Sequence, residues 1–216
     1  MSTEPTSRAA LGNEEGDLRF VETIQVLSGQ ALALPYHQAR MERTIRHFFP
    51  SWASEDMPSL ESLLDPTPEM ALFKARVVYG AQGVEAVEYV PYAMRTIRSL
   101  QVVEDDTIDY AYKCCDRSSL AALVARKGTC DEIIIVKNGL LTDTSYTNLA
   151  LFDGRQWLTP RVPLLAGTKR AALLDQGLLQ PADLSVNDLR SAQKVRLFNA
   201  MIDFGTCEVE TSHICF

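Results

Sequence analysis

DEIIIVKNGLLTDTSYTNL, the stretch from Asp131 to Leu149, decides much of the fold. The run Glu132–Val136 is rich in β-branched residues, which predicts a buried strand. Asn138–Gly139 is typical of a tight hairpin turn, because both residues adopt positive φ angles at low cost. A short return strand, Leu140–Leu141, follows this turn, and the polar run after it leads into a further strand, Asn148–Phe152. The stretch therefore predicts short strands joined by tight turns.

Outward from this stretch, helices and strands alternate in two lobes, which we place at residues 18–97 and 103–216. The first is predicted to be a small α/β unit. The second has many short strands between glycine turns, which favours a barrel-like sheet over an open parallel one. The predicted fold class is α+β. Strands are expected over residues 20–27, 31–34, 72–79, 84–92, 102–111, 132–136, 140–141, 148–152, 156–158, 195–200 and 207–210, and helices over 36–49, 60–64, 118–127, 168–176 and 187–192.

Composition narrows the class of protein. The chain has 216 residues and a formal net charge of -7, which argues against a nucleic-acid surface. Its polar, acidic first 17 residues contain no secretory signal, and we expect them to form a disordered or loosely ordered tail. No apolar run reaches the roughly 18 residues that span a membrane. The five cysteines show no CxxC spacing, so we expect no metal site and a location in the reducing cytoplasm.

Four short motifs occur in a fixed order along the chain. They are YKCCDR at residues 112–117, LTDTSYTN at 141–148, LTP at 158–160 and LLAGTKR at 164–170. Each motif alone is weakly specific. In this order and spacing they resemble the class IV aminotransferase family, whose members bind pyridoxal 5'-phosphate (PLP). The resemblance implies the two-lobed fold of D-amino-acid aminotransferase, known as fold type IV, with PLP in the cleft between the lobes. The chain is therefore expected to be an enzyme.

The resemblance also implies roles for two residues that would act on the reactive end and the ring of PLP. Lys113 occupies the position of the family's catalytic lysine, which forms a Schiff base with the cofactor. Asp143 stands where the family has a glutamate that keeps the pyridine nitrogen protonated. The shorter aspartate leaves open whether it would reach this nitrogen directly or through water. A plain structural alternative for Asp143 is an aspartate in a turn before a strand.

The phosphate group of PLP requires a cradle of donors and a cation. The motif GTKR opens a predicted helix, whose free N–H groups and dipole attract an anion, although Thr168 is also an ordinary N-cap residue. The segment YHQARMERT resembles the family's H-x-x-R helix and offers Arg40 to the phosphate, unless this arginine belongs to a solvated helix face. The candidate cofactor-binding residues are Arg40, Lys113, Asp143, Gly167, Thr168, Lys169, Asn199 and Ala200.

The reaction type is less determined than the family. Arg117, four residues after Lys113, and the segment FNAM at 198–201 both resemble the family's aminodeoxychorismate lyases, which release pyruvate to give 4-aminobenzoate for folate synthesis. The alternatives are a transaminase of branched-chain or D-amino acids and a PLP-fold module without catalysis. Glu22 and Arg117 are weak candidates for contact with a small-molecule amino substrate. By the family's habit we expect a homodimer, and neither nucleic-acid nor membrane partners.

Overall fold

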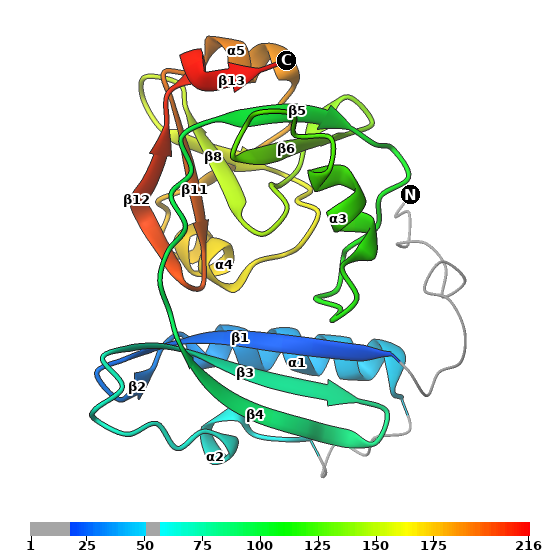
Figure 1. Ribbon diagram of the computed structural model, residues 1–216, viewed down its shortest axis with the longest axis vertical. Helices are drawn as coiled ribbons and strands as arrows, with labels where there is room; N and C mark the ends of the chain where they lie inside the picture. Colours follow the sequence, from blue (N-terminus) through cyan, green and yellow to red (C-terminus); the bar gives the residue numbers. More distant parts are fainter. Residues whose placement is uncertain (1–17, 51–56) are drawn as a thin grey trace.

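The computed structural model describes residues 18–50 and 57–216, so the predicted tail at residues 1–17 lies outside the described residues. A four-stranded antiparallel sheet of order β2-β1-β3-β4 forms the first lobe, with helices α1 and α2 beside it (Figure 1). The bounds of these elements are β1 (Arg19–Leu27), β2 (Gln30–Ala31), α1 (Leu34–Phe48), α2 (Leu60–Leu63), β3 (Leu72–Gly80) and β4 (Gly83–Pro91).

Helix α1 packs along β1 because its apolar residues recur at helical spacing. Met41 and Ile45 are fully buried and lie in one core cluster with Phe20 and Ile24 of β1. Strand β1 is buried along almost its whole length, which is the pattern of a strand covered on both faces. One face meets α1 and the other meets the second lobe, so alternate residues of β1 point toward different parts of the site.

Two sheets and three helices form the second lobe. A five-stranded sheet has the order β10-β9-β8-β11-β12, and a four-stranded sheet has the order β13-β5-β6-β7. Their apolar faces share one core that includes Ile134, Leu149 and Leu197. The bounds are β5 (Leu100–Glu104), α3 (Ser118–Val124), β6 (Glu132–Lys137), β7 (Leu140–Leu141), β8 (Asn148–Phe152), β9 (Trp157–Pro160), α4 (Thr168–Asp175), β10 (Gln180–Ala182), α5 (Val186–Ser191), β11 (Lys194–Asn199), β12 (Ile202–Val209), the 3-10 helix η3 (Thr211–His213) and β13 (Ile214–Cys215).

The two lobes are joined through the segment that contains Lys113. The Val21 N–H donates a hydrogen bond of 3.0 Å to the carbonyl of Lys113, and the Cys115 N–H donates one of 2.8 Å to the carbonyl of Arg19. Phe20 and Cys114 form an isolated antiparallel bridge between these two bonds. The backbone of Lys113 is thereby fixed against β1, which belongs to the other lobe.

The predicted α+β, two-lobed fold is confirmed, and most predicted elements lie within a few residues of their observed bounds. The prediction of a strand over 102–111 was wrong: β5 ends at Glu104, and residues 105–117 form a loop held by side-chain bonds. The carboxylate of Asp105, for example, accepts hydrogen bonds from the backbone of Thr107 and Ile108.

The proposed boundaries 18–97 and 103–216 leave out the first residues of the second lobe, because β5 pairs with β6 from Leu100 onward. Among the described residues, no helix is long and apolar enough to cross a membrane.

Candidate active site

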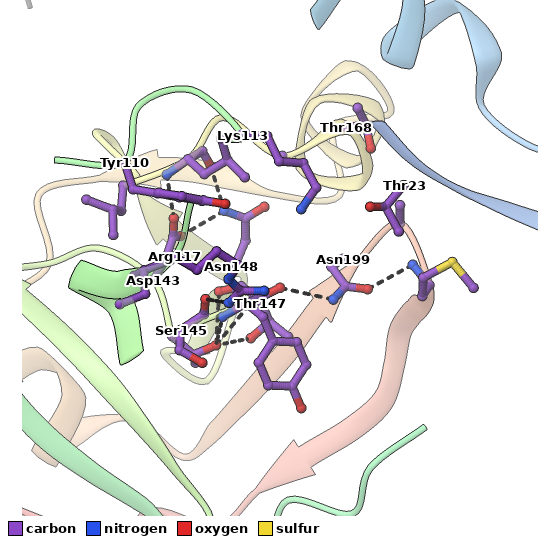
Figure 2. Close-up of a pocket in the computed structure, with 18 of the residues that line it drawn as sticks. Thr23, Tyr110, Lys113, Arg117, Asp143, Ser145, Thr147, Asn148, Thr168 and Asn199 are labelled. Atoms are coloured by element: carbon purple, nitrogen blue, oxygen red, sulfur yellow. Dashed lines mark hydrogen bonds between the residues drawn. The ribbon is translucent and has the colours of Figure 1, made fainter. Parts of the chain in front are cut away.

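A pocket between the two lobes gathers most of the residues that the sequence motifs predicted (Figure 2). Strand β1, helix α1, the loop around Lys113, the turn after β7, the N-terminus of α4 and the turn between β11 and β12 all contribute to its wall. Eight predicted residues line the pocket: Arg40, Lys113, Arg117, Asp143, Gly167, Thr168, Asn199 and Ala200.

The amine of Lys113 is prepared to act as a nucleophile or base. Burial is the main cause that lowers its pKa from 10.5 to about 7, and the positive charges of Arg40 and Arg117 lower it further, against the opposing effect of Glu22. Within the described part of the chain the amine has no ion-pair partner, whereas the carbonyl of the same residue is fixed to β1. A substantial fraction of the amine is therefore neutral near pH 7.

Asp143 is a buried carboxylate with two fixed donors. Its Oδ1 accepts a hydrogen bond of 2.8 Å from Asn148 Nδ2, and its Oδ2 accepts one of 2.7 Å from the Leu165 N–H. Burial raises the pKa of Asp143 to about 7, although these two donors and the charge of Arg170 favour the ionised form. Each oxygen keeps a further lone pair, so the carboxylate can still accept a proton or a hydrogen bond from a ligand.

The N-terminus of α4 faces the same pocket without a side-chain cap. Gly167 is the N-cap residue, and its backbone packs so closely on Asn148 that a Cβ atom there would overlap the side-chain oxygen of Asn148. The first N–H groups of an uncapped helix are free donors, and the helix dipole favours an anion beside them. Thr168, at the first helical position, is buried and also lines the pocket.

Arg40 is held on α1 by a buried carboxylate. Its Nε donates to Glu22 Oε1 at 2.9 Å and its Nη2 donates to Glu22 Oε2 at 2.6 Å. Burial would raise the pKa of Glu22, but the charge of Arg40 and the hydrogen bonds from His37 and Arg40 lower it to about 2. Because a guanidinium carries five N–H donors, Arg40 keeps donors for an anion in the pocket.

Two predicted residues do not line this pocket. Glu22 is fully buried against α1 and bonded to Arg40, and the strand alternation turns Thr23 into the pocket. The contact of Glu22 with a substrate stays a prediction. The side chain of Lys169 forms an ion pair with Asp203 on β12 and lines a neighbouring pocket. The contact of its backbone N–H group with a phosphate stays a prediction.

Asn199 reaches the pocket but uses its side chain to build the turn between β11 and β12. Its Oδ1 accepts hydrogen bonds from the N–H groups of Met201 and Ile202, at 2.8 and 3.0 Å, and its Nδ2 donates to the carbonyl of Tyr146 at 3.0 Å. The residue therefore fixes the backbone of Ala200 at the pocket wall. Figure 2 shows dashed lines that end at Asn199.

The sequence motifs missed several residues of the pocket. Tyr110 lies in the loop that was predicted as a strand, and its hydroxyl donates a 2.7 Å hydrogen bond to the carbonyl of Cys114, beside Lys113. No local pattern indicates this role. The turn residues Ser145, Tyr146 and Thr147 could have been found, because they lie between Asp143 and Asn148 in one of the quoted motifs.

Comparison with known families agrees with this site. The model of the family "Amino-transferase class IV" matches residues 19–206, which include every pocket residue described above. The chain belongs to the class IV aminotransferase family. This confirms the family that the four sequence motifs indicated.

Relatives of this class IV aminotransferase cover most of its length. A protein of Haemophilus influenzae without an assigned function is 35% identical over 181 residues, which are 83% of this chain and 96% of the relative. A crystal structure from Haemophilus somnus, named as a candidate 4-amino-4-deoxychorismate lyase, is 34% identical with a TM-score of 0.76 and covers 86% of this chain and 97% of that one. The PLP-bound form of a hypothetical Mycobacterium tuberculosis aminotransferase shares the fold, with 20% identity, a TM-score of 0.69 and coverage of 92% and 81%.

Class IV aminotransferases are PLP-dependent enzymes, and the pocket residues fit this cofactor. Lys113 offers an amine of lowered pKa, and Asp143 offers a buried carboxylate for a ring nitrogen. The uncapped end of α4 and the guanidinium of Arg40 offer donors and positive charge for a phosphate. Gly167 has no side chain, and a Cβ atom there would overlap the side-chain oxygen of Asn148, so the helix end can lie close to the residue that holds Asp143.

Proposed function

We propose that this class IV enzyme is an aminodeoxychorismate lyase, which eliminates pyruvate from 4-amino-4-deoxychorismate and leaves 4-aminobenzoate for folate synthesis. The observation that carries the proposal is the fixed position of Arg117 on the pocket wall near Lys113. Arg117 Nη2 donates a 2.7 Å hydrogen bond to the Ser145 carbonyl, while the residue remains exposed. The name of the Haemophilus somnus relative supports the same reaction.

The chemistry of this substrate suits an exposed guanidinium at the pocket. Aminodeoxychorismate carries two carboxylates, one on the ring and one on the enolpyruvyl group that leaves as pyruvate. A guanidinium binds a carboxylate through two parallel hydrogen bonds, and Arg117 uses one of its amino groups for the Ser145 contact. We therefore assign Arg117 to orient a substrate carboxylate above Lys113.

The residues of the pocket divide the work as follows. PLP, when bound, withdraws electrons from the substrate carbon attached to the amino group. Arg40, Gly167 and Thr168 hold its phosphate, and Asp143 keeps its ring nitrogen protonated, which requires the ionised carboxylate. Lys113 Nζ removes and returns a proton, because its lowered pKa makes the neutral amine available near pH 7.

The test is to incubate the PLP-loaded protein with aminodeoxychorismate in the absence of any added keto acid. A lyase should produce 4-aminobenzoate and pyruvate in equal amounts over many turnovers. Lys113→Ala should abolish the reaction. Arg117→Ala should raise KM for aminodeoxychorismate by roughly 10-fold or more, because one charge-assisted hydrogen bond contributes about 1.5–3 kcal/mol, while PLP affinity should stay unchanged.

The alternative reaction gives a different result in a parallel incubation. If no 4-aminobenzoate forms, yet amino groups move from branched-chain or D-amino acids to 2-oxoglutarate, the enzyme is a transaminase. Its product would then depend on the added keto acid, since a transaminase needs an acceptor to complete each cycle. The lyase proposal is overturned by this outcome.

We also propose that the enzyme works as a homodimer in the cytoplasm. The support is the short chain, the family's habit of completing each cleft from a second subunit, and five cysteines that are all free thiols. Sedimentation velocity at the assay concentration tests the dimer. A fully active monomer would contradict it.

A further inference from the structure

A buried chain of hydrogen bonds runs from Arg40 to the helix end that faces the pocket. Arg40 is bonded to Glu22, and His37 Nδ1 lies 2.6 Å from Glu22 Oε2. The other ring nitrogen, His37 Nε2, lies 3.3 Å from the hydroxyl of Thr168 at the start of α4. His37 and Glu22 are both fully buried. Residues of β1, α1 and α4 are thus connected through one imidazole.

The direction of each hydrogen bond follows from the charges. Glu22 is ionised, so it can only accept, and His37 Nδ1 must carry the proton between them. Burial is the main cause that lowers the pKa of His37, against the opposing effect of Glu22, so the ring is neutral. Its Nε2 is then an acceptor. The Thr168 hydroxyl consequently donates its proton to His37 and has none left for a ligand.

A phosphate dianion in the pocket requires the opposite direction for the hydrogen bond between Thr168 and His37. Phosphate oxygens accept hydrogen bonds, so a Thr168 hydroxyl that contacts them must donate to the phosphate. His37 Nε2 must then donate to Thr168, which requires a proton on both ring nitrogens. We propose that His37 takes up one proton when the phosphate of PLP binds, and thereby positions the Thr168 hydroxyl as a phosphate donor. This inference rests on the PLP site described above.

The charged groups around His37 are consistent with such uptake. Glu22 faces the ring from β1, Arg40 from the next turn of α1 and Lys113 from the loop between β5 and α3. The neighbouring pocket, which His37 also lines, contains Tyr36, Lys169 and Asp203, and the last two form an ion pair. With a neutral imidazole, the charge of Glu22 opposes that of Arg40, so Arg40 and the end of α4 compensate a dianion only in part. A protonated His37 supplies one positive charge.

Isothermal titration calorimetry in two buffers of different ionisation enthalpy measures this proton directly. The ligand is 4-deoxypyridoxine 5'-phosphate, which has no aldehyde and cannot react with a lysine. The Lys113→Met variant is used throughout, so that the titration of Lys113 does not contribute. At pH 8 a phosphate monoester is already a dianion, because its second pKa is about 6. We expect the uptake of about one proton per ligand, since one ring nitrogen changes from acceptor to donor.

Two further substitutions make the test specific. In His37→Gln the side-chain amide can donate to Thr168 without a proton, so binding should persist and the uptake should disappear. In Thr168→Val the hydroxyl is absent, so uptake should disappear while His37 is retained. The affinity of the Lys113→Met protein should also rise as the pH falls from 9 toward 7, by up to about tenfold per unit, and that of the His37→Gln variant should change less. Circular dichroism verifies that both variants fold.

The outcomes separate this proposal from the proposed function. Ligand binding without proton uptake, or equal uptake in the His37→Gln variant, would overturn the role of His37 and leave the PLP enzyme intact. Failure of the wild-type protein to bind PLP, measured by its visible absorbance, would overturn the proposed function and this inference together.

Discussion

Asn148 holds Asp143 in place from the first residue of strand β8: its Nδ2 donates to Asp143 Oδ1 at 2.8 Å and to the Leu165 carbonyl at 2.9 Å. The Leu165 N–H donates in turn to Asp143 Oδ2 at 2.7 Å. The side-chain oxygen of Asn148 lies against the backbone of Gly167. One amide group therefore connects the carboxylate, the loop before α4 and the helix end.

The first prediction concerns Gly167→Ala. The added Cβ would overlap the Asn148 oxygen, and Asn148 can move only by breaking its two hydrogen bonds. We expect the free energy of unfolding to fall by about 1–3 kcal/mol, the cost of leaving buried polar groups unsatisfied, and PLP affinity to fall as well. Urea unfolding and PLP titration measure the two effects. In the Gly167→Ala/Asn148→Ala double variant, stability should recover part of its loss, but PLP affinity should not.

Short motifs predicted the chemistry of this cluster, because the residues within each motif keep a fixed spacing. The run from Asp143 to Asn148 is one turn, so its sequence spacing determines its geometry. The partners of these residues come from elsewhere in the chain. Arg40 meets Glu22 only because β1 packs on α1, and nothing local to either residue encodes that pairing.

The wrong strand over residues 102–111 has the same physical origin. The hydrophobic residues in 102–111 suggested a continuous strand. Ile108 and Tyr110 are indeed buried, but they lie in a loop that is stabilised by hydrogen bonds to the side chain of Asp105. The ion pair between Lys169 and Asp203, which lie on different elements, is a further contact that no motif indicates. Periodicity reports which residues are buried, and it does not distinguish a strand from an ordered loop.

The second prediction concerns the reactivity of Lys113. Its pKa of about 7 means that half of the amine is neutral near pH 7, whereas an ordinary lysine reaches this point near pH 10.4. Borohydride reduction of the PLP-loaded protein, followed by peptide mapping, should place the label on Lys113. In the ligand-free protein, the rate of reductive methylation of Lys113 should rise with increasing pH, with a midpoint near pH 7. Labelling of Lys127, Lys137 or Lys169 in its place would contradict the assignment.

The third prediction concerns the buried pair of Arg40 and Glu22. Arg40→Met removes the cation and leaves the fully buried Glu22 carboxylate without its main partner. Breaking a buried ion pair on one side costs about 3–5 kcal/mol, so urea unfolding should show a loss of this size. Arg40→Met/Glu22→Gln should be more stable than Arg40→Met alone, since no buried charge remains. Both variants should bind PLP weakly. Equal stability of the two would show that the carboxylate is compensated in another way.

The fourth prediction concerns Arg170, whose side chain connects the two ends of the loop between β9 and α4. Arg170 lies in the first turn of α4, directly after this loop. Its Nη2 donates a 2.7 Å hydrogen bond to the carbonyl of Pro160, directly before the loop. The side chain is buried, and its Nε has no hydrogen-bond partner within the described ranges. Its charge favours the ionised form of Asp143. Arg170 therefore supports Asp143 by geometry and by charge.

Arg170→Met should raise the pKa of Asp143 further above 7, whereas Arg170→Lys keeps the charge and should raise it less. The raised pKa of Asp143 determines how the stability of the protein depends on pH. A carboxyl whose folded pKa is raised contributes stability that is complete below its unfolded pKa of 3.8 and lost as the pH rises toward about 7. In Arg170→Met this loss should extend to higher pH. Infrared difference spectra against Asp143→Asn measure the protonated carboxyl directly. An unchanged titration midpoint of Asp143 in Arg170→Met would show that the charge of Arg170 does not act on Asp143 and that the arginine only supports the loop.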